Sequence, residues 1–496
     1  MLTIFITILA IYAVIYVIKF YKNASRYPPG PFPLPLLGNI HQMEPVYIAD
    51  YFQTISKTHG SIFTIYLPDP VIVITSYELI KEALVTKGDD FIGRSNGYPD
   101  CFFQLEPHKG ISFNDSENWR VQRSVSMQIL KDFGMAKSIM EDRVNDCIDD
   151  MFNHINPTIA NNELVDFRAP VQLCISNITG SIVFGSKGTC EEDLSRINNY
   201  VKTLDEVSVA LSDLFVGTLY RVFGSNPWII SFFNLFKTKG VVLMQQFGRN
   251  VKEDVAKLKK TFVKGEEPTN FIHAYMEKME TVGGYINEDQ LDAVIVDLWF
   301  AGLDTTRATM LHFFNLMALY PEKQQKAREE ILKVVGPDQL ITMADKVRLP
   351  YCTALVFELQ RIANILSFII SHRCVRDTEV GGHKILKDTI IFPQIFNVMK
   401  YDEVFDDTNS FKPERFLNED ESAIVKGSTE RVIPFSLGKR QCMGMSLVNV
   451  ELFLISIRFL QKYKISVPAG QTPPKQQAPW GIITKPEPYP FKVEAL

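Results

Sequence analysis

The sequence predicts a mainly α-helical protein with small β-sheets, preceded by one N-terminal transmembrane helix. Three observations lead to this fold class. Residues 1–18 are apolar and carry no charge. Apolar residues recur at mostly helical spacing from about residue 117 to 335, and β-rich runs occur near residues 61–75 and after about residue 370. With 496 residues, 46% of them hydrophobic, the chain can bury a sizeable core.

Residues 1–20 are interpreted as a membrane signal anchor. The charge-free run is followed directly by Lys19, Lys22 and Arg26, and a helix crosses a bilayer with about 17–25 residues. A cleaved signal peptide is the alternative, but the segment lacks a basic start and an obvious small-residue cleavage site. The positive-inside rule then places the basic flank and the rest of the chain in the cytoplasm.

Residues 21–43 form a basic and proline-rich hinge, and residues 44–496 form the main domain. Five prolines between Tyr27 and Pro35 favour a stiff, extended connector. The seven cysteines show neither CxxC pairs nor the density of a disulfide scaffold, which indicates a reducing environment. A net charge of −5 provides no basic field for nucleic acid.

The most informative segment runs from Phe435 to Gly444 and holds a single cysteine, Cys442. A lone cysteine is usually a buried structural thiol, but Gly438 and Gly444 flank this one and Arg440 precedes it by two residues. Glycines permit a tight bend by reaching conformations closed to other residues. Backbone N–H groups can then point at the sulfur, and a guanidinium can pair with a carboxylate. The segment therefore suits a thiolate that ligates haem iron.

This segment resembles the haem-ligand loop of the cytochrome P450 superfamily, since it fills every fixed position of that pattern, Phe-x-x-Gly-x-Arg-x-Cys-x-Gly. The resemblance covers nearly the whole chain and points to the animal microsomal family 2 branch. It implies the cytochrome P450 fold for residues 44–496, haem b with Cys442 as the axial thiolate, and the endoplasmic reticulum membrane as the location. A thiolate ligand pushes electron density onto the iron and favours cleavage of the O–O bond.

A second motif, Ala301-Gly302-Leu303-Asp304-Thr305-Thr306, lies in an apolar helical stretch. It matches the oxygen-activation motif of the superfamily. Small Ala301 and Gly302 would let the helix approach the haem, while Asp304 and Thr305 would relay protons to dioxygen bound there. A mid-helix Asp-Thr-Thr is more often a solvated face, but an acid within an apolar run is costly unless it is paired or used.

Besides Arg440, donors for the haem propionates are expected at two places. Trp119 and Arg123 lie one helical turn apart and offer an indole N–H and a guanidinium. His372 falls where related microsomal enzymes hold a further donor, and the adjacent Arg373 is a rival for that role. Taken alone, a Trp-x-x-x-Arg pattern is more often a half-buried aromatic beside a surface charge.

Glu358 and Arg361 place opposite charges three residues apart among apolar neighbours. Arg415, in a Pro-Glu-Arg-Phe segment, matches the family position that joins this pair. Such pairs are usually surface features of little energetic weight. These three residues are predicted to form a buried network that supports the haem-binding core rather than to take part in catalysis.

The resemblance also suggests which residues line the substrate pocket. They are almost all apolar, which favours lipophilic substrates, although each could equally be plain core. The candidates are Phe102, Phe103, Phe113, Phe300, Ala301, Ile365, Leu366, Ile370, Ile482 and Ile483.

No glycine-rich nucleotide loop precedes a helix, so the chain is expected to receive electrons from a partner. The implied partner is NADPH–cytochrome P450 reductase, possibly with cytochrome b5. Basic residues Arg120, Lys131, Lys137 and Lys439 are candidates for its docking surface, although an ordinary solvated surface would look the same.

The predicted function is a haem-thiolate monooxygenase that inserts one oxygen atom from O2 into a lipophilic xenobiotic, fatty acid or steroid. One alternative is a thiolate-haem isomerase or dehydratase, a class that often lacks the threonine found here as Thr305. Another is a non-catalytic haem- or lipid-binding protein, which would need neither Asp304 nor Thr305.

Overall fold

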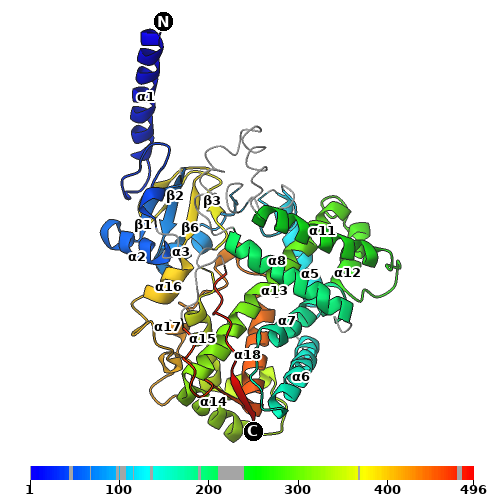
Figure 1. The fold of residues 1–496 in the computed structure, drawn as a ribbon. Coiled ribbons are helices and arrows are strands. Elements are labelled where there is room, and N and C mark those ends of the chain that lie inside the picture. The colour runs from blue at the N-terminus through cyan, green and yellow to red at the C-terminus, as the bar shows by residue number, and fades with distance from the viewer. Residues whose placement is uncertain are drawn as a thin grey trace.

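A computed structural model describes residues 2–43, 48–67, 69–95, 100, 108–115, 117–134, 138–187, 191–210, 239–366, 369–476 and 483–496. It is mostly helical, as predicted (Figure 1). Its α-helices are α1 (Leu2–Ala24), α2 (Ile48–His59), α3 (Tyr77–Lys81), α5 (Asn118–Asp132), α6 (Ser138–Ala160), α7 (Arg168–Val183), α8 (Glu191–Ala210), α11 (Lys239–Lys259), α12 (Phe271–Thr281), α13 (Glu288–Leu319), α14 (Pro321–Val334), α15 (Pro350–Ala363), α16 (Ile395–Tyr401), α17 (Lys426–Thr429) and α18 (Met445–Lys462).

Short 3-10 turns punctuate the chain at η1 (Ile40–Gln42), η4 (Met343–Arg348), η5 (Pro413–Phe416) and η6 (Gly438–Arg440), and a π-helical turn, η3 (Glu82–Thr86), continues α3. The strands are β1 (Ile62–Tyr66), β2 (Pro70–Ile74), β3 (His372–Arg373), β4 (Thr378–Val380), β5 (His383–Ile385), β6 (Ile390–Pro393), β7 (Tyr463–Ser466) and β8 (Lys492–Ala495).

The largest sheet has the strand order β1-β2-β6-β3. β1 and β2 are the hairpin predicted near residues 61–75, paired antiparallel with Ile62 opposite Ile74. β6 joins β2 in parallel and β3 joins β6 antiparallel, so the sheet combines the two β-rich regions of the sequence. These strands are almost fully buried, which explains their continuous apolar runs.

α13 is the central helix of the larger, helical part (Figure 1). The Asn287 side chain caps its start by accepting a hydrogen bond from the Gln290 N–H. Its C-terminal half is buried on all sides. Phe314 stacks on Phe167, the residue before α7, with ring centroids 3.7 Å apart, and Phe314 also meets Phe459 of α18 edge-on. α13 is therefore a fixed scaffold for the side chains of its middle turns.

The N-terminal helix α1 projects from the body beside β1 and β2 (Figure 1). It is long and apolar enough to cross a membrane and has no buried residue. It runs through the basic flank to Ala24, beyond the predicted anchor boundary at residue 20. The proline-rich connector is not simply extended: Leu34 pairs with Gly38, and the Pro29 carbonyl accepts from the Thr64 N–H of β1. Backbone bonding to the sheet thus fixes the connector on the domain.

Candidate functional site

The loop before α18 presents Cys442. The Cys442 N–H donates to the Phe435 carbonyl at 3.0 Å, which closes the loop around η6. Gly438 has φ +75°, and a Cβ there would lie 1.8 Å from the Leu84 carbonyl oxygen, so glycine is required. Gly444 differs from expectation: its φ is −80° at the N-cap of α18, a conformation open to any residue. Only the first glycine supplies the bend.

The Cys442 sulfur accepts backbone hydrogen bonds from Gly444 and Met445. Burial raises the pKa of its thiol, while these bonds and the charge of Arg123 act in the opposite direction. Although surrounding protein shields its sulfur from bulk water, Cys442 keeps exposed surface, whereas the other four cysteines that the structure describes are buried. Of these five thiols, only that of Cys442 is therefore accessible to a bound group.

Guanidinium groups gather beside this loop. Arg440 is 8% exposed and donates to the carbonyls of Ile92, Ile111 and Asn114, the last at 2.7 Å. Burial, together with the nearby charges of Arg94 and Arg123, lowers the pKa of Arg440 to about 7. Within the described residues its hydrogen bonds all go to backbone carbonyls, and the carboxylate of Asp115 acts on it only at longer range.

Trp119 lies against the same cluster. The guanidinium of Arg440 sits 3.6 Å from the centre of the Trp119 ring, while the buried indole Nε1–H has no partner among the described residues. A buried cation with no carboxylate in hydrogen-bond contact and an orphaned N–H are costly unless an anionic acceptor joins them. The two propionate carboxylates of a haem fit these donors, and Cys442 is within electrostatic range of Arg123. The residues present therefore fit the group.

Between the two rival donors, the geometry favours His372. Arg373 is committed elsewhere, since its guanidinium pairs with Asp115 and, at 2.7 Å, with Asp388. His372 is 3% exposed, and its Nδ1 lies 2.8 Å from the Phe91 carbonyl. Burial, followed by the charges of Arg94 and Arg440, lowers its pKa well below the ordinary value, so the ring is neutral at the edge of the cation cluster.

Sequence reasoning missed Arg94. It is 5% exposed, donates from Nε to the Ser112 carbonyl at 3.0 Å and from Nη1 to the Ser371 carbonyl at 3.1 Å, and burial lowers its pKa to about 10. No local pattern distinguishes it among the 52 Lys and Arg residues of the chain. Arg123, which the sequence predicts as a propionate donor, donates to the Gln441 carbonyl at 2.5 Å, next to Cys442.

In the middle of α13, Thr305 donates from its hydroxyl to the Ala301 carbonyl at 2.9 Å, and Ala301 is exposed. Gly302 does not serve the expected purpose, because a Cβ there would meet the Thr179 side chain of α7 at 2.9 Å. Its small size permits the α13–α7 contact instead. Asp304 is 2% exposed and is ion-paired, so its charge is compensated.

The predicted pocket residues are partly brought together. Phe113, Phe300 and Ile370 belong to one apolar cluster, which also contains Trp119. Leu366 and Ile483 form an isolated β-bridge, and the Ile365 carbonyl accepts from the Thr484 N–H at 2.8 Å, although Ile365 packs on a different cluster. Phe102, Phe103 and Ile482 lie outside the described residues.

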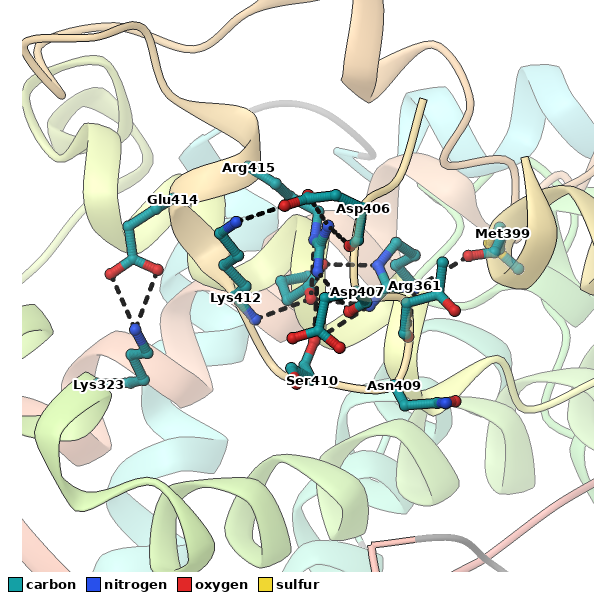
Figure 2. Close-up of polar contacts among 12 residues, drawn as sticks. Lys323, Arg361, Met399, Asp406, Asp407, Asn409, Ser410, Lys412, Glu414 and Arg415 are labelled. Atoms are coloured by element: carbon teal, nitrogen blue, oxygen red, sulfur yellow. Dashed lines mark hydrogen bonds and ion pairs between the residues drawn. The ribbon is translucent and has the colours of Figure 1, made fainter. Parts of the chain in front are cut away.

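The predicted charge network is buried between α15 and η5. Arg361 makes a fork to Glu358, at 2.7 Å from Nε and 2.8 Å from Nη2, and Arg415 Nε reaches Glu358 at 3.1 Å. Figure 2 shows Arg361 and Arg415 converging on the 406–412 segment, where the Thr408 carbonyl accepts from Arg361 and the Asp406 carbonyl accepts from Arg415. Glu358 is 0% exposed and its charge is fully compensated.

Comparisons with known proteins agree with this geometry. The sequence model of the family "Cytochrome P450" matches residues 28–493. The chain is 32% identical to Cytochrome P450 2F3 of Capra hircus over 96% of this chain and 95% of that protein. It is 32% identical to Cytochrome P450 2F2 of Mus musculus, covering 89% and 88%, and 30% identical to Cytochrome P450 2B4 of Oryctolagus cuniculus, covering 90% and 89%. The chain with this cysteine loop and cation cluster therefore belongs to the cytochrome P450 family of haem monooxygenases.

Proposed function

We propose that this protein is a membrane-anchored monooxygenase that inserts one atom of O2 into a lipophilic small molecule, using electrons that an NADPH-dependent flavoprotein reductase delivers. The observation that carries the proposal is the accessible Cys442 beside a buried cluster of cations with no carboxylate bonded to Arg440. The similarity to family 2 cytochromes P450 supports the endoplasmic reticulum as the location.

Cys442 would hold the haem iron, and Arg440, Arg94, Trp119 and His372 would hold the propionates. The bound haem would supply the oxygen chemistry, while the protein supplies orientation, protons and exclusion of water. The backbone N–H groups of Gly444 and Met445 would moderate the charge of the sulfur.

Thr305 and Asp304 would deliver protons on the α13 side. The Thr305 hydroxyl donates to the Ala301 carbonyl, and rotation about its Cα–Cβ bond would free it to donate elsewhere. Asp304 is buried one residue away and would have to leave its ion pairs to exchange protons. Phe113, Phe300 and Ile370 would hold an apolar substrate nearby, since their cluster offers mainly hydrophobic contact.

The test is a carbon monoxide difference spectrum of the full-length protein, reduced by NADPH through an added microsomal reductase. A red-shifted Soret band is expected, and the Cys442→Ser variant should lose it. A band that appears only with a chemical reductant would contradict the reductase route. Thr305→Ala should keep the band but lose product formation per NADPH; unchanged product formation per NADPH in this variant would contradict the proposed role of Thr305.

The docking surface for the reductase is proposed around Arg120 and Lys439. Both cations pair with Asp89, at 3.3 and 2.6 Å, and all three are at least half exposed, so an acidic partner must compete with Asp89. Lys131 is also exposed, and Lys137 lies outside the described residues. Charge reversal of Lys131 and Lys439 should slow electron transfer and weaken its salt dependence; an unchanged rate and salt response would exclude this surface.

A further inference from the structure

Four charged side chains meet where α8, α13 and the C-terminal segment come together. Asp304 Oδ1 lies 3.2 Å from Arg307 Nη1, and Asp304 Oδ2 lies 2.6 Å from Lys485 Nζ. The same two cations also bind a second carboxylate, Asp205 of α8: Arg307 Nη1 is 3.2 Å from its Oδ1, and Lys485 pairs with the same oxygen. Two cations are thus shared between two carboxylates.

The arrangement is largely withdrawn from solvent. The side chains of Asp304, Arg307 and Lys485 are 3%, 6% and 16% exposed, and that of Asp205 is 42% exposed. Burial raises the pKa of Asp205, but Arg307 and Lys485 outweigh this and hold it below its ordinary value. Buried charges are tolerated only when they are paired, so no member can be lost without leaving another uncompensated.

The four members come from three separate parts of the structure. Arg307 is on α13, one turn after Asp304, and stays with it. Lys485 follows the segment whose Thr484 N–H donates to the Ile365 carbonyl at 2.8 Å. Asp205 belongs to α8. The ion pairs of Asp304 therefore depend on the positions of α8 and of residues 483–496.

Two further charges border the group. Asp166 and Arg168, at the start of α7, pair with each other and interact at longer range with Arg307 and Asp205, respectively. Because this pair is internally compensated, it adds little net charge. The competition that matters is between Asp205 and Asp304 for the same two cations.

We propose that Arg307 and Lys485 are positioning residues for Asp304, and that Asp205 on α8 shares both cations and so weakens their hold on it. This inference rests on the proposed role of Asp304 in proton delivery. With Lys485 neutral, Asp304 is held only by Arg307, and the ion-pair link between Asp304 and the C-terminal segment is lost. With Asp205 neutral, both cations bind Asp304 alone, and that link is strengthened.

The first test uses backbone hydrogen exchange of the full-length haem-loaded protein without substrate. Lys485→Met should raise exchange in peptides covering residues 301–307, and Lys485→Arg should restore it. Asp205→Asn should raise exchange in α8 but lower it, or leave it unchanged, in residues 301–307. A purely structural cluster would give increased exchange at 301–307 in both neutral variants, which would overturn the proposal.

The matched control is Asp254→Asn. Asp254 of α11 pairs with Arg196 of α8 and accepts from the Tyr200 hydroxyl at 2.8 Å, so it ties α8 to α11 through charges other than those around Asp304. This variant should raise exchange in α8 with no effect at residues 301–307. An effect there equal to that of Lys485→Met would show general loosening and contradict the proposal.

The second test separates the positioning role from the underlying function. Lys485→Met should reduce the rate of product formation about five-fold, with a smaller fall in NADPH consumption and an altered solvent isotope effect, whereas Lys485→Arg should behave like the parent. If Asp304→Asn lowers product formation but Lys485→Met does not, the positioning proposal fails alone. If Asp304→Asn has no effect, the proton-delivery role itself is wrong.

Discussion

Gly438 shows how much one residue decides in the cysteine loop. Its positive φ and the approach of the Leu84 carbonyl leave no room for a Cβ, whereas at Gly444 a Cβ would make only an ordinary contact, 3.8 Å from the Cys442 sulfur. The two glycines of the motif therefore serve different purposes. The backbone conformation and the contact with Leu84 require glycine at position 438. Neither the backbone conformation nor the neighbouring protein atoms require glycine at position 444.

We predict that Gly438→Ala destabilises the protein by about 1–3 kcal/mol or more, because the strained conformation is combined with a clash. Gly427→Ala is the control, since a Cβ there meets nothing within 4 Å. Denaturant unfolding followed by circular dichroism measures both. Equal stability of the two variants would show that the loop can relax around position 438.

At the scale of elements, Asp297 joins α13 to the 108–115 loop. Its Oδ2 accepts from the N–H groups of Ile111 and Ser112, at 2.6 and 2.9 Å. The carbonyls of these two residues in turn accept from Arg440 and Arg94. The Asp297 carboxylate on α13 thus holds the 108–115 loop, and this loop positions the guanidinium groups of Arg440 and Arg94.

The pH dependence of stability should reveal Asp297. Burial raises its pKa from 3.8 to about 6, although the two backbone N–H bonds oppose this. The folded state therefore retains a proton that the unfolded state has lost, and the wild type loses stability as pH rises from about 4 to about 6. Because the Asn side chain does not titrate, the unfolding free energy of Asp297→Asn should rise relative to that of the wild type by on the order of 3 kcal/mol over this interval.

Chemical unfolding of both proteins at pH values across this interval measures the difference. Asn can still accept the two N–H bonds with its amide oxygen, whereas Asp297→Ala cannot. Asp297→Ala should therefore have the same pH dependence as Asp297→Asn, with a lower unfolding free energy at every pH. A difference between wild type and Asp297→Asn that does not vary with pH would contradict the prediction.

The pairing of α15 with η5 depends on Arg361, whose side chain is 1% exposed. We predict that Arg361→Met lowers the unfolding free energy by about 3–5 kcal/mol, because Glu358 is left with only part of its compensation. Lys264→Met, at an ion pair 77% and 40% exposed, should change it by less than about 1 kcal/mol. Similar losses in both variants would mean that burial adds nothing to the network.

At the scale of the whole molecule, α1 stands outside the packed body. The Phe20 and Tyr66 rings are 5.5 Å apart, and the Tyr21 hydroxyl donates to the Pro33 carbonyl, so the helix base rests on the domain. Deleting residues 2–20 should remove the protein from the membrane fraction and leave the carbon monoxide spectrum unchanged, since α1 buries no residue. Cell fractionation and the spectrum measure this, and loss of the spectrum would show that the helix supports folding.

The sequence by itself determined the features that are encoded locally: the helical class, the β1–β2 hairpin, the apolar N-terminal helix, the Cys442 loop and the Asp304–Thr305 motif. Each depends on spacing within a few residues, which a single chain displays directly. The same holds for Glu358 and Arg361, which are one helical turn apart.

Only the tertiary structure decided which residues meet across long stretches of chain. It brought Arg94 to Arg440, paired Arg373 with Asp115 and Asp388, turned Gly302 toward α7, and gave Asp304 the partners Arg307 and Lys485. The physical reason is that burial and charge compensation depend on neighbours in space, and residues far apart in the chain become neighbours only when the helices and the sheet pack together.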